Sequence, residues 1–472
     1  MKYLIWPISL FIAEYFSTNF PIYYGHRIQI YIYIIFILIA LTQLKGEIPK
    51  NIFNQKVIMF VGILLVIQLI SMVFSYYRID ISEYNKSPNK TFIAFCSFVF
   101  SILMHYFVVR LNVREVRDIK KFLRGGWIAL IISLIVCLVQ LFYLFLPSIF
   151  EPFVKFFGSS LEARWGGRET DNSFYQLGSY VQTTLRVNGL TEEASNLATQ
   201  FFVVFIPFLI ASIKNKYNLF LGNTQNIGPL YRVLFIIIIL LIMAKTTSGF
   251  LFAAITLLFL FKQFSKVQKI FAVLCLFSIL LFLITINFNS VYMSNSINEF
   301  LLNKSGNSVS NRSGSTIALL KTALANPFIG VGYEYHTYYI FEYLPEWAKH
   351  NDEYFLRIKQ KDYPILSDIL GMFAEYGILI MFFIFGYVIK KIKALRKISN
   401  EGFKLKVKDA SLIKTLTDSA KYYFIFIFIS LLFSFVWFAS IYLILFFFFI
   451  SIIPIFRKYL NDKSKEMTSN FK

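Results

Sequence analysis

Long apolar runs are the feature that most limits what this chain can fold into. Residues 420–456 form one such run, and as a single helix they would be roughly 55 Å long, nearly twice the ~30 Å hydrocarbon core of a bilayer. They must therefore form a hairpin of two membrane-spanning helices. Hydrophobic residues make up 57% of the chain and charged residues only 15%, which excludes a soluble enzyme, a secreted domain and a disordered chain. The sequence predicts an all-α polytopic membrane protein.

About twelve transmembrane helices fit these runs, in one integral membrane domain over residues 1–472. We expect the spans near 3–16, 28–43, 57–76, 91–109, 127–147, 194–213, 230–245, 249–262, 269–288, 365–389, 420–437 and 440–456. Lys and Arg gather in alternate connections, most densely in the basic cytoplasmic loop 390–419. The formal charge of +21 therefore indicates orientation, with both termini cytoplasmic, and no nucleic-acid partner. The first run lacks a small-x-small cleavage site and Glu14 interrupts it, so we expect a retained span.

Two connections on the outer face are too long for simple turns. They are residues 148–193 and 289–364. Loops of this length are usually functional or disordered, and the many aromatic residues in both favour order. We expect folded extracytoplasmic elements that cap a cavity.

Several familiar kinds of site are missing from the sequence. It has no GxxxxGK[ST] motif for a nucleotide, and Cys96, Cys137 and Cys275 lie inside apolar runs as expected for small buried hydrophobes. Glu169-Thr170-Asp171 is a weak metal candidate that is more often a solvated turn. We therefore expect no metal and no cofactor. Of the few ionisable residues within spans, His105 and Glu375 are interpreted as satisfied inside the bundle.

One informative segment ends the first long connection and runs into a span. Thr191 is predicted to cap that helix, with Glu192 and Glu193 in its first turn, where acids suit the helix dipole. This does not explain Arg186, which stands just outside the helix at the membrane surface. An arginine there can hold a phosphate with its planar fork. Its partner could equally be a lipid headgroup or a lipid-diphosphate substrate.

The second connection carries two further polar elements. Arg312 precedes a helical stretch that ends at Pro327, and Gly330-Val331-Gly332 follows. The glycines suggest a turn with positive φ or a close backbone approach to a ligand. His350-Asn351 stands shortly before the next span, and His336 competes with His350 as the working histidine. Two arginines and a histidine on the same side of the membrane indicate an anion-binding and proton-transfer site.

These elements together resemble the O-antigen polymerase and O-antigen ligase superfamily over most of the chain. Arg186-x-x-Gly189 followed by Glu193-Ala194-Ser195 is similar to a motif of those polymerases, although Ala194 stands where they usually have proline. Arg312 before Gly330-x-Gly332 resembles their second arginine element. His350-Asn351 before Glu375-x-Gly377 resembles their histidine element.

The resemblance implies a metal-independent glycosyltransferase of the C-type membrane fold. Its substrate would be an oligosaccharide on undecaprenyl diphosphate, handled at the periplasmic face of the bacterial inner membrane, with membrane lipids around it. Arg186 and Arg312 would stabilise the departing diphosphate, because preorganised cations are effective where negative charge develops. His350 would act as the base, with Glu193 as the alternative. Substrate-binding roles are expected, in second rank, for Arg164, Arg168, Gly330, Gly332 and Asn351.

Three functions remain open on the sequence. The Glu193-Ser195 element favours a polymerase that joins repeat units over a ligase that transfers the finished chain to a lipid A core. A flippase or exporter of lipid-linked sugars is the alternative from another class, and it would need more buried charge than the spans contain. A polymerase of this type resembles those that work with a separate chain-length regulator and flippase.

Overall fold

The computed structural model describes most of the chain. The described residues are 2–12, 15, 18–19, 22–44, 52, 55–79, 86–165, 168, 173–222, 227–263, 269, 307–433 and 439–469. Glu14, the Glu169-Thr170-Asp171 candidate and Cys275 lie outside them. The predicted span 269–288 also lies outside them, apart from its first residue.

Every other predicted span coincides with a helix, which confirms an all-α membrane protein. These helices are α1 (Ile5–Pro7) with the π-turn η1 (Ile8–Ile12), α3 (Ile22–Gln43), α4 (Gln55–Arg78), α6 (Pro88–Asn112), α7 (Val116–Phe145), α10 (Ala194–Gln200) with η3 (Phe201–Phe205) and α11 (Ile206–Asn215), α12 (Gly228–Met243), α13 (Thr247–Phe261), α19 (Asp368–Lys404), α20 (Ala410–Leu431) and α21 (Ser440–Ser469). Among the described residues, six helices are long and apolar enough to cross a membrane, and α12 and α13 are shorter apolar helices. The described part contains no β-strand.

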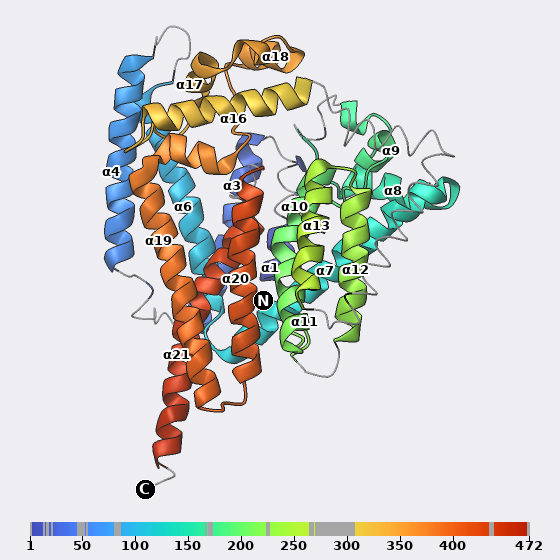
Figure 1. Ribbon diagram of the computed structural model, residues 1–472, viewed down its shortest axis with the longest axis vertical. Helices are drawn as coiled ribbons and strands as arrows, with labels where there is room; N and C mark the ends of the chain where they lie inside the picture. Colours follow the sequence, from blue (N-terminus) through green and yellow to red (C-terminus); the bar gives the residue numbers. More distant parts are fainter. Residues whose placement is uncertain are drawn as a thin grey trace.

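The predicted hairpin at 420–456 is present as two antiparallel helices. Figure 1 shows α20 rising through the bundle and α21 returning beside it to the C-terminal end. The helix α19 runs on to Lys404, well past its apolar part. The basic segment 390–419 is therefore largely helical, because Lys and Arg are good helix formers.

The span formed by α10, η3 and α11 is the centre of the bundle. In its most apolar stretch 94% of the residues are buried, whereas in the corresponding stretch of α4, at the edge of the bundle, 17% are buried. Phe202 in η3 is stacked between Phe252 of α13 and Phe426 of α20, with ring centroids 4.1 and 4.3 Å apart. Such ring pairs add to the stabilisation from burial alone. The centre therefore gives a rigid base to whatever precedes α10.

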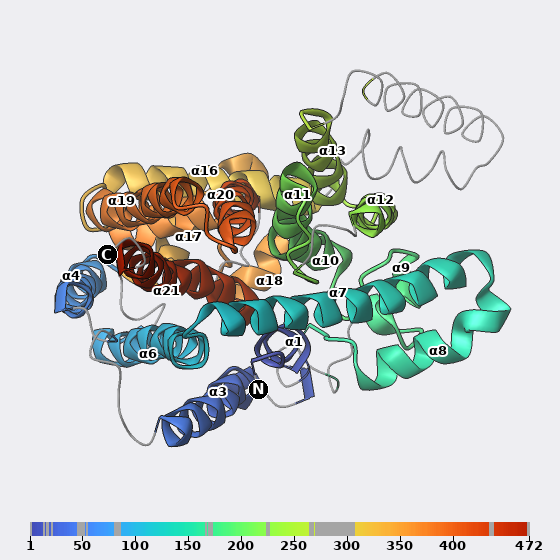
Figure 2. The ribbon, with the colours of Figure 1, turned by 90° about the horizontal axis from the view of Figure 1, so that it is seen from below.

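The two long connections contain helices of their own. The first holds α8 (Pro147–Ser160), η2 (Ser173–Tyr175) and α9 (Tyr180–Thr184); the second holds α16 (Asn307–Ala325), α17 (His336–Tyr343), η5 (Glu346–Ala348) and α18 (Asp352–Gln360). Figure 1 shows α16, α17 and α18 lying across one end of the bundle, opposite the C-terminal end of α21. Figure 2, which looks from below, shows α8 projecting from the side of the bundle next to α9. We call the end covered by α16–α18 the capped end.

Candidate functional site

Arg186 lies in a tight connection between α9 and α10. The connection turns at Leu185 and Gly189, whose φ angles are 55° and 62°. A Cβ on Gly189 would lie 2.9 Å from Cδ1 of Leu197 and 3.2 Å from the sulfur of Cys137. Glycine is therefore required here by both the backbone angle and the packing.

Gln140, buried in α7, fixes this connection by hydrogen bonds in both directions. Its side-chain oxygen accepts from the backbone N–H of Gly189 at 2.7 Å and of Asn188 at 3.2 Å. Its amide nitrogen donates to the carbonyl of Gly189 at 2.8 Å and to Oδ1 of Asn188 at 3.1 Å. A polar residue within a membrane span thus serves to hold the backbone that follows Arg186.

Glu162 is a second buried anchor for the same connection. Its carboxylate accepts hydrogen bonds from Oγ of Ser179 at 2.7 Å, from the N–H of Tyr180 at 2.9 Å and from Nδ2 of Asn188 at 2.9 Å. Burial raises the pKa of Glu162, and these three bonds oppose the rise without cancelling it. Glu162 therefore joins the segment before α9 to the segment after it.

The raised pKa of Glu162 makes the stability of the fold depend on pH. The folded chain keeps this proton at pH values where the unfolded chain has lost it, so the free energy of unfolding should fall as pH rises above the ordinary value of 4.5. We expect Glu162→Gln to match the wild type near pH 4.5 and to have the higher thermal midpoint at pH 8. Glu342→Gln, which removes an exposed carboxylate, should leave the pH profile unchanged. Parallel wild-type and Glu162→Gln profiles in detergent would contradict this role.

Arg186, Tyr180 and Glu193 form a cluster at the start of α10. Burial and the nearby Glu193 carboxylate raise the pKa of the Tyr180 hydroxyl. The charge of Arg186 and a hydrogen bond between Tyr180 and Arg186 lower that pKa. Ser195 Oγ donates to the Glu193 carboxylate. A cation and a carboxylate therefore both act on Tyr180 in this connection, and an anion-binding site with an adjacent base requires one of each.

The sequence predicted Thr191 as the N-cap of α10, and this prediction was wrong. Glu193, and not Thr191, occupies the N-cap position of α10, so the glutamates lie before the helix. The Thr191 hydroxyl donates instead to the carbonyls of Asn188 and Glu193, both at 2.8 Å. Local hydrogen bonding in the turn therefore prevails over capping.

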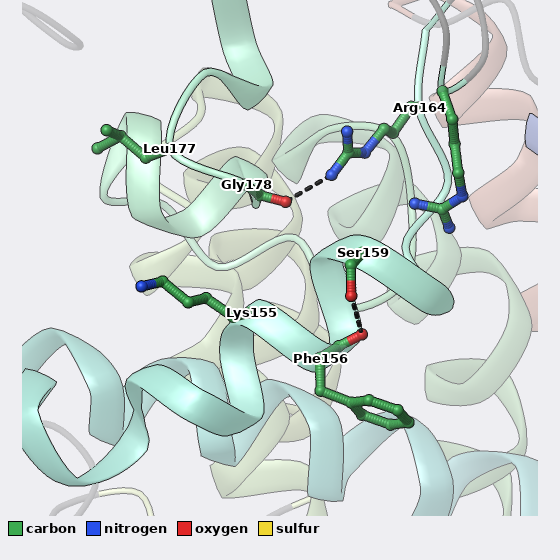
Figure 3. A pocket seen from close by; sticks show the side chains of 7 residues that line it. Lys155, Phe156, Ser159, Arg164, Leu177 and Gly178 are labelled. Carbon is green, nitrogen blue, oxygen red and sulfur yellow. Dashed lines mark hydrogen bonds between the residues drawn. The ribbon is translucent and has the colours of Figure 1, made fainter.

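Arg164 and Arg168 occupy a neighbouring pocket. Figure 3 shows Arg164 reaching the carbonyl of Gly178 across the space above α8. Gly178 lines this pocket, and Tyr180, two residues later, interacts with Arg186. The sequence predicted binding roles for both arginines, and the structure places both in the lining of this pocket, to which Arg186 does not contribute.

Arg312 lies on the first part of α16, with its side chain exposed. Its neighbour Asn311 is buried and accepts a hydrogen bond from the Tyr363 hydroxyl. Figure 1 shows α16 lying across the capped end of the molecule. Arg312 is therefore an exposed cation at the capped end.

His350 and Asn351 have different surroundings although they are adjacent. His350 is exposed in the turn before α18. Asn351 is buried, caps α18 by accepting from the N–H of Tyr354 at 2.8 Å, and donates to the carbonyl of Ala348 at 2.8 Å. A helix cap accounts for Asn351. His350 is the member of this pair that a substrate can reach.

Gly330 and Gly332 approach the chain's own backbone. Their φ angles are 70° and 90°. A Cβ on Gly330 would lie 2.5 Å from the carbonyl carbon and oxygen of Glu375, and one on Gly332 would lie 2.9 Å from the backbone nitrogen of Met72. Opposite them, α19 is interrupted at Gly377, where φ is 72°. Both glycines therefore have the positive φ that the sequence suggested, and they closely approach the chain itself, Gly330 at the break in α19 and Gly332 at α4.

A polar stripe on α4 completes this junction. Ser71 and Ser75 donate to the carbonyls of Ile329 and Val331 at 3.0 and 2.6 Å. Gln68 accepts from the N–H of Tyr333 at 2.9 Å and donates to the carbonyl of Glu375 at 3.1 Å. The spacing of three and four residues puts all three on one face of the helix. Polar residues inside an apolar span were the available signal for this contact.

His336 and Glu375 form a buried pair at the same junction. Nδ1 of His336 lies 2.7 Å from Oε1 of Glu375, and Nε2 lies 3.1 Å from the carbonyl oxygen of Tyr363. Because a carbonyl only accepts, Nε2 carries a proton, and Nδ1 is engaged by Glu375 whichever of the two holds the remaining proton. His336 therefore has no lone pair to offer a substrate.

Replacing His336 should affect stability more than chemistry. His336→Ala removes the histidine partner of the buried Glu375, which keeps the hydrogen bond from the N–H of Glu334 at 2.8 Å, and we expect a loss of roughly 3 kcal/mol in the free energy of unfolding. His350→Ala, at an exposed position, should change it by no more than about 0.5 kcal/mol. Thermal unfolding of both variants in detergent compares them directly. Equal midpoints would contradict the buried pair.

The described residues hold no group of three or more His, Cys, Asp or Glu side chains that could bind a metal ion. The acidic candidate at 169–171 lies outside them.

Comparison with known families gives one match. Residues 233–385 match the family described as O-antigen ligase. That stretch includes Arg312, both glycines, His336, His350 and Glu375, and it ends before the basic part of α19. Arg186 and Glu193 precede it. No curated protein matches the chain.

Proposed function

Because this chain belongs to the O-antigen ligase/polymerase superfamily, we propose that it is an O-antigen polymerase. It joins oligosaccharide repeat units carried on undecaprenyl diphosphate, at the periplasmic face of the inner membrane. The observation that supports this most is the Arg186 cluster, in which Arg186 and Glu193 both act on Tyr180, in a connection held by Gln140 and Glu162.

The reaction needs charge stabilisation at the leaving group. A sugar hydroxyl of one unit attacks the anomeric carbon of another chain, and a new glycosidic bond forms as the bond to the diphosphate oxygen breaks. The diphosphate leaves with the electron pair. A fixed arginine stabilises that charge better than a mobile one, since no reorganisation is needed as the bond breaks. Arg186 takes this role, and Arg312 binds the same diphosphate from α16.

The proton of the attacking hydroxyl goes to a carboxylate or a histidine. Glu193 is our first candidate, because it lies in the same cluster as Arg186. His350 is the second, because it is exposed on the same end of the molecule. His336 is set aside, since both its ring nitrogens are occupied.

The proposed topology has twelve spans with both termini in the cytoplasm. The capped end then faces the periplasm, and the basic turn between α19 and α20 faces the cytoplasm. Lys120 of α7 pairs with Asp409 in that turn at 2.8 Å, and Lys214 of α11 pairs with Asp418 of α20 at 2.9 Å. The enzyme needs no metal in this scheme. A chain-length regulator and a flippase are its proposed partners.

A ligase is the second candidate, because the matched family is described as O-antigen ligase. It uses the same leaving group and differs in the acceptor, which would be a lipid A core. The Arg186 cluster serves either reaction equally well.

Purified protein supplied with lipid-linked repeat units alone distinguishes these activities. A polymerase should make a ladder of longer chains in liposomes. Growth only on an added lipid A core would establish the ligase. Movement of units between leaflets without any new bond would establish a transporter and contradict both.

A further inference from the structure

The pocket beside α8 is lined by three basic side chains, and none of Arg186, Tyr180 and Glu193 is in its lining. It has a volume of about 490 Å³, which is within the range of ligand pockets. Figure 3 shows Lys155 of α8 and Arg164 on opposite sides of it. The residues around it that matter here are Lys155, Phe156, Ser159, Arg164, Arg168 and Gly178.

Two guanidinium groups are held next to each other in this pocket by backbone carbonyls. The carbonyl oxygen of Gly158 accepts from Arg164 at 2.9 Å and from Arg168 at 2.8 Å. Arg164 also donates to the carbonyl of Gly178, and Arg168 to the carbonyl of Glu162 at 3.1 Å and to Oδ1 of Asn19 at 2.6 Å. Each guanidinium has five N–H donors, so both retain donors after these bonds. The arginines are therefore prearranged and still able to bind an anion.

Neither guanidinium group of the pair forms an ion pair with a described carboxylate, and Glu162 acts on both only at longer range. Within the part of the chain that the structure describes, no carboxylate lies at ion-pairing distance from Arg164 or Arg168. Nε of Arg164 is buried without a hydrogen-bond partner there. Burial and then the charge of Arg164 lower the pKa of Arg168, and the Glu162 carboxylate opposes this fall without cancelling it. An arrangement that holds two cations together at this cost is expected where a bound anion offsets it.

The adjoining helix shows which kind of anion fits. Ile149, Phe153 and Phe156 lie on one face of α8 with exposed fractions of 59%, 55% and 56%. Phe156 also lines the pocket, so the apolar face continues into the cationic wall. Figures 1 and 2 both show α8 at the periphery, where a bilayer can reach it. A ligand that fits both surfaces has an anionic head and an apolar tail.

We propose that this pocket binds the phosphate headgroup of an anionic membrane phospholipid, whose acyl chains lie along the exposed face of α8. Arg164 and Arg168 bind the phosphate from within the pocket, and Lys155, which pairs with Glu151 at 2.7 Å, lies on the α8 side of the pocket. This lipid is distinct from the substrate, whose diphosphate belongs to the Arg186 cluster. The site needs no movement of the chain.

Binding of phosphatidylglycerol to the purified full-length protein tests the proposal. Native mass spectrometry in detergent should detect one tightly bound phosphatidylglycerol per chain, and phosphatidylcholine should bind at least about tenfold more weakly. Lys155→Glu combined with Phe156→Ser changes two exposed positions and should weaken phosphatidylglycerol binding by about tenfold or more. Lys359→Glu combined with Phe355→Ser, an equivalent pair of exposed positions on α18, is the matched control and should bind as the wild type does.

Four results would overturn the proposal. They are equal binding of phosphatidylglycerol and phosphatidylcholine, equal losses in the α8 and α18 variants, binding of inorganic phosphate as tight as that of the lipid, and displacement of phosphatidylglycerol by equimolar undecaprenyl diphosphate. The last would make the pocket part of the substrate site. Arg164→Gln with Arg168→Gln gives a second arm, in which retained lipid binding by a folded protein would also count against it.

Discussion

Arg186→Ala is expected to slow chain elongation on the order of 10²- to 10³-fold. Removing one preorganised donor from a site where negative charge develops has effects of this size. The connection that carries Arg186 is held by Gln140 and Glu162 through contacts that do not involve its side chain, so the variant should fold. The measurement is the initial rate of ladder formation by purified protein in liposomes.

Arg117→Ala provides the control for this experiment. Arg117 is an exposed arginine of α7 that pairs with Glu115, and its loss should leave the elongation rate unchanged. Arg186→Lys should recover only part of the rate, because an ammonium group lacks the planar fork of arginine. An elongation rate in Arg186→Ala within threefold of the wild type, at equal amounts of folded protein, would remove Arg186 from the reaction.

Gly330→Ala should be among the most destabilising single changes in the chain. A positive φ costs an alanine about 1–2 kcal/mol, and its methyl group would lie 2.5 Å from the Glu375 carbonyl, which a shift of backbone must relieve at a further cost of about 1–3 kcal/mol. We therefore expect a loss of at least about 2 kcal/mol in the free energy of unfolding. Thermal or denaturant unfolding in detergent measures it.

Gly386→Ala is the matched substitution within α19. A Cβ there meets nothing within 4 Å, and the position lies in the helix interior. Alanine is the better helix former by about 1 kcal/mol, so this variant should be as stable as the wild type or more so. If both variants unfold at the same midpoint, the junction between Gly330 and the break in α19 is not as tight as described.

Much of the fold could be predicted because a membrane span depends on the local sequence. The length of each apolar run determines where a helix can cross, and the basic residues between runs indicate which side each turn faces. The run at 420–456 is an example, since its length alone required the hairpin of α20 and α21. The end of α19 was harder to predict, because helix propensity continues through its lysines after the apolar run has ended.

The contacts that build the site could not be read from the sequence because they join distant segments. Asn188 is bound by Gln140, which lies in α7, and by Glu162, which follows α8. His336, at the start of α17, pairs with Glu375 of α19. Only a weak signal existed: Gln140 and Gln68 are polar residues inside apolar spans, where a partner is required. The motif around Arg186 and Gly189 was found from the sequence. The buried side chains that fix its backbone, Gln140 and Glu162, were not.

The central claim is that Arg186 and Arg312 bind one diphosphate. A double-mutant cycle measures this through the dissociation constant of undecaprenyl diphosphate for the wild type, Arg186→Ala, Arg312→Ala and the double variant. Two arginines on the same diphosphate should show a coupling free energy of about 0.5–3 kcal/mol, with the double variant losing less or more than the sum of the single losses. Strictly additive losses, or an Arg312→Ala variant that binds as tightly as the wild type, would contradict the claim.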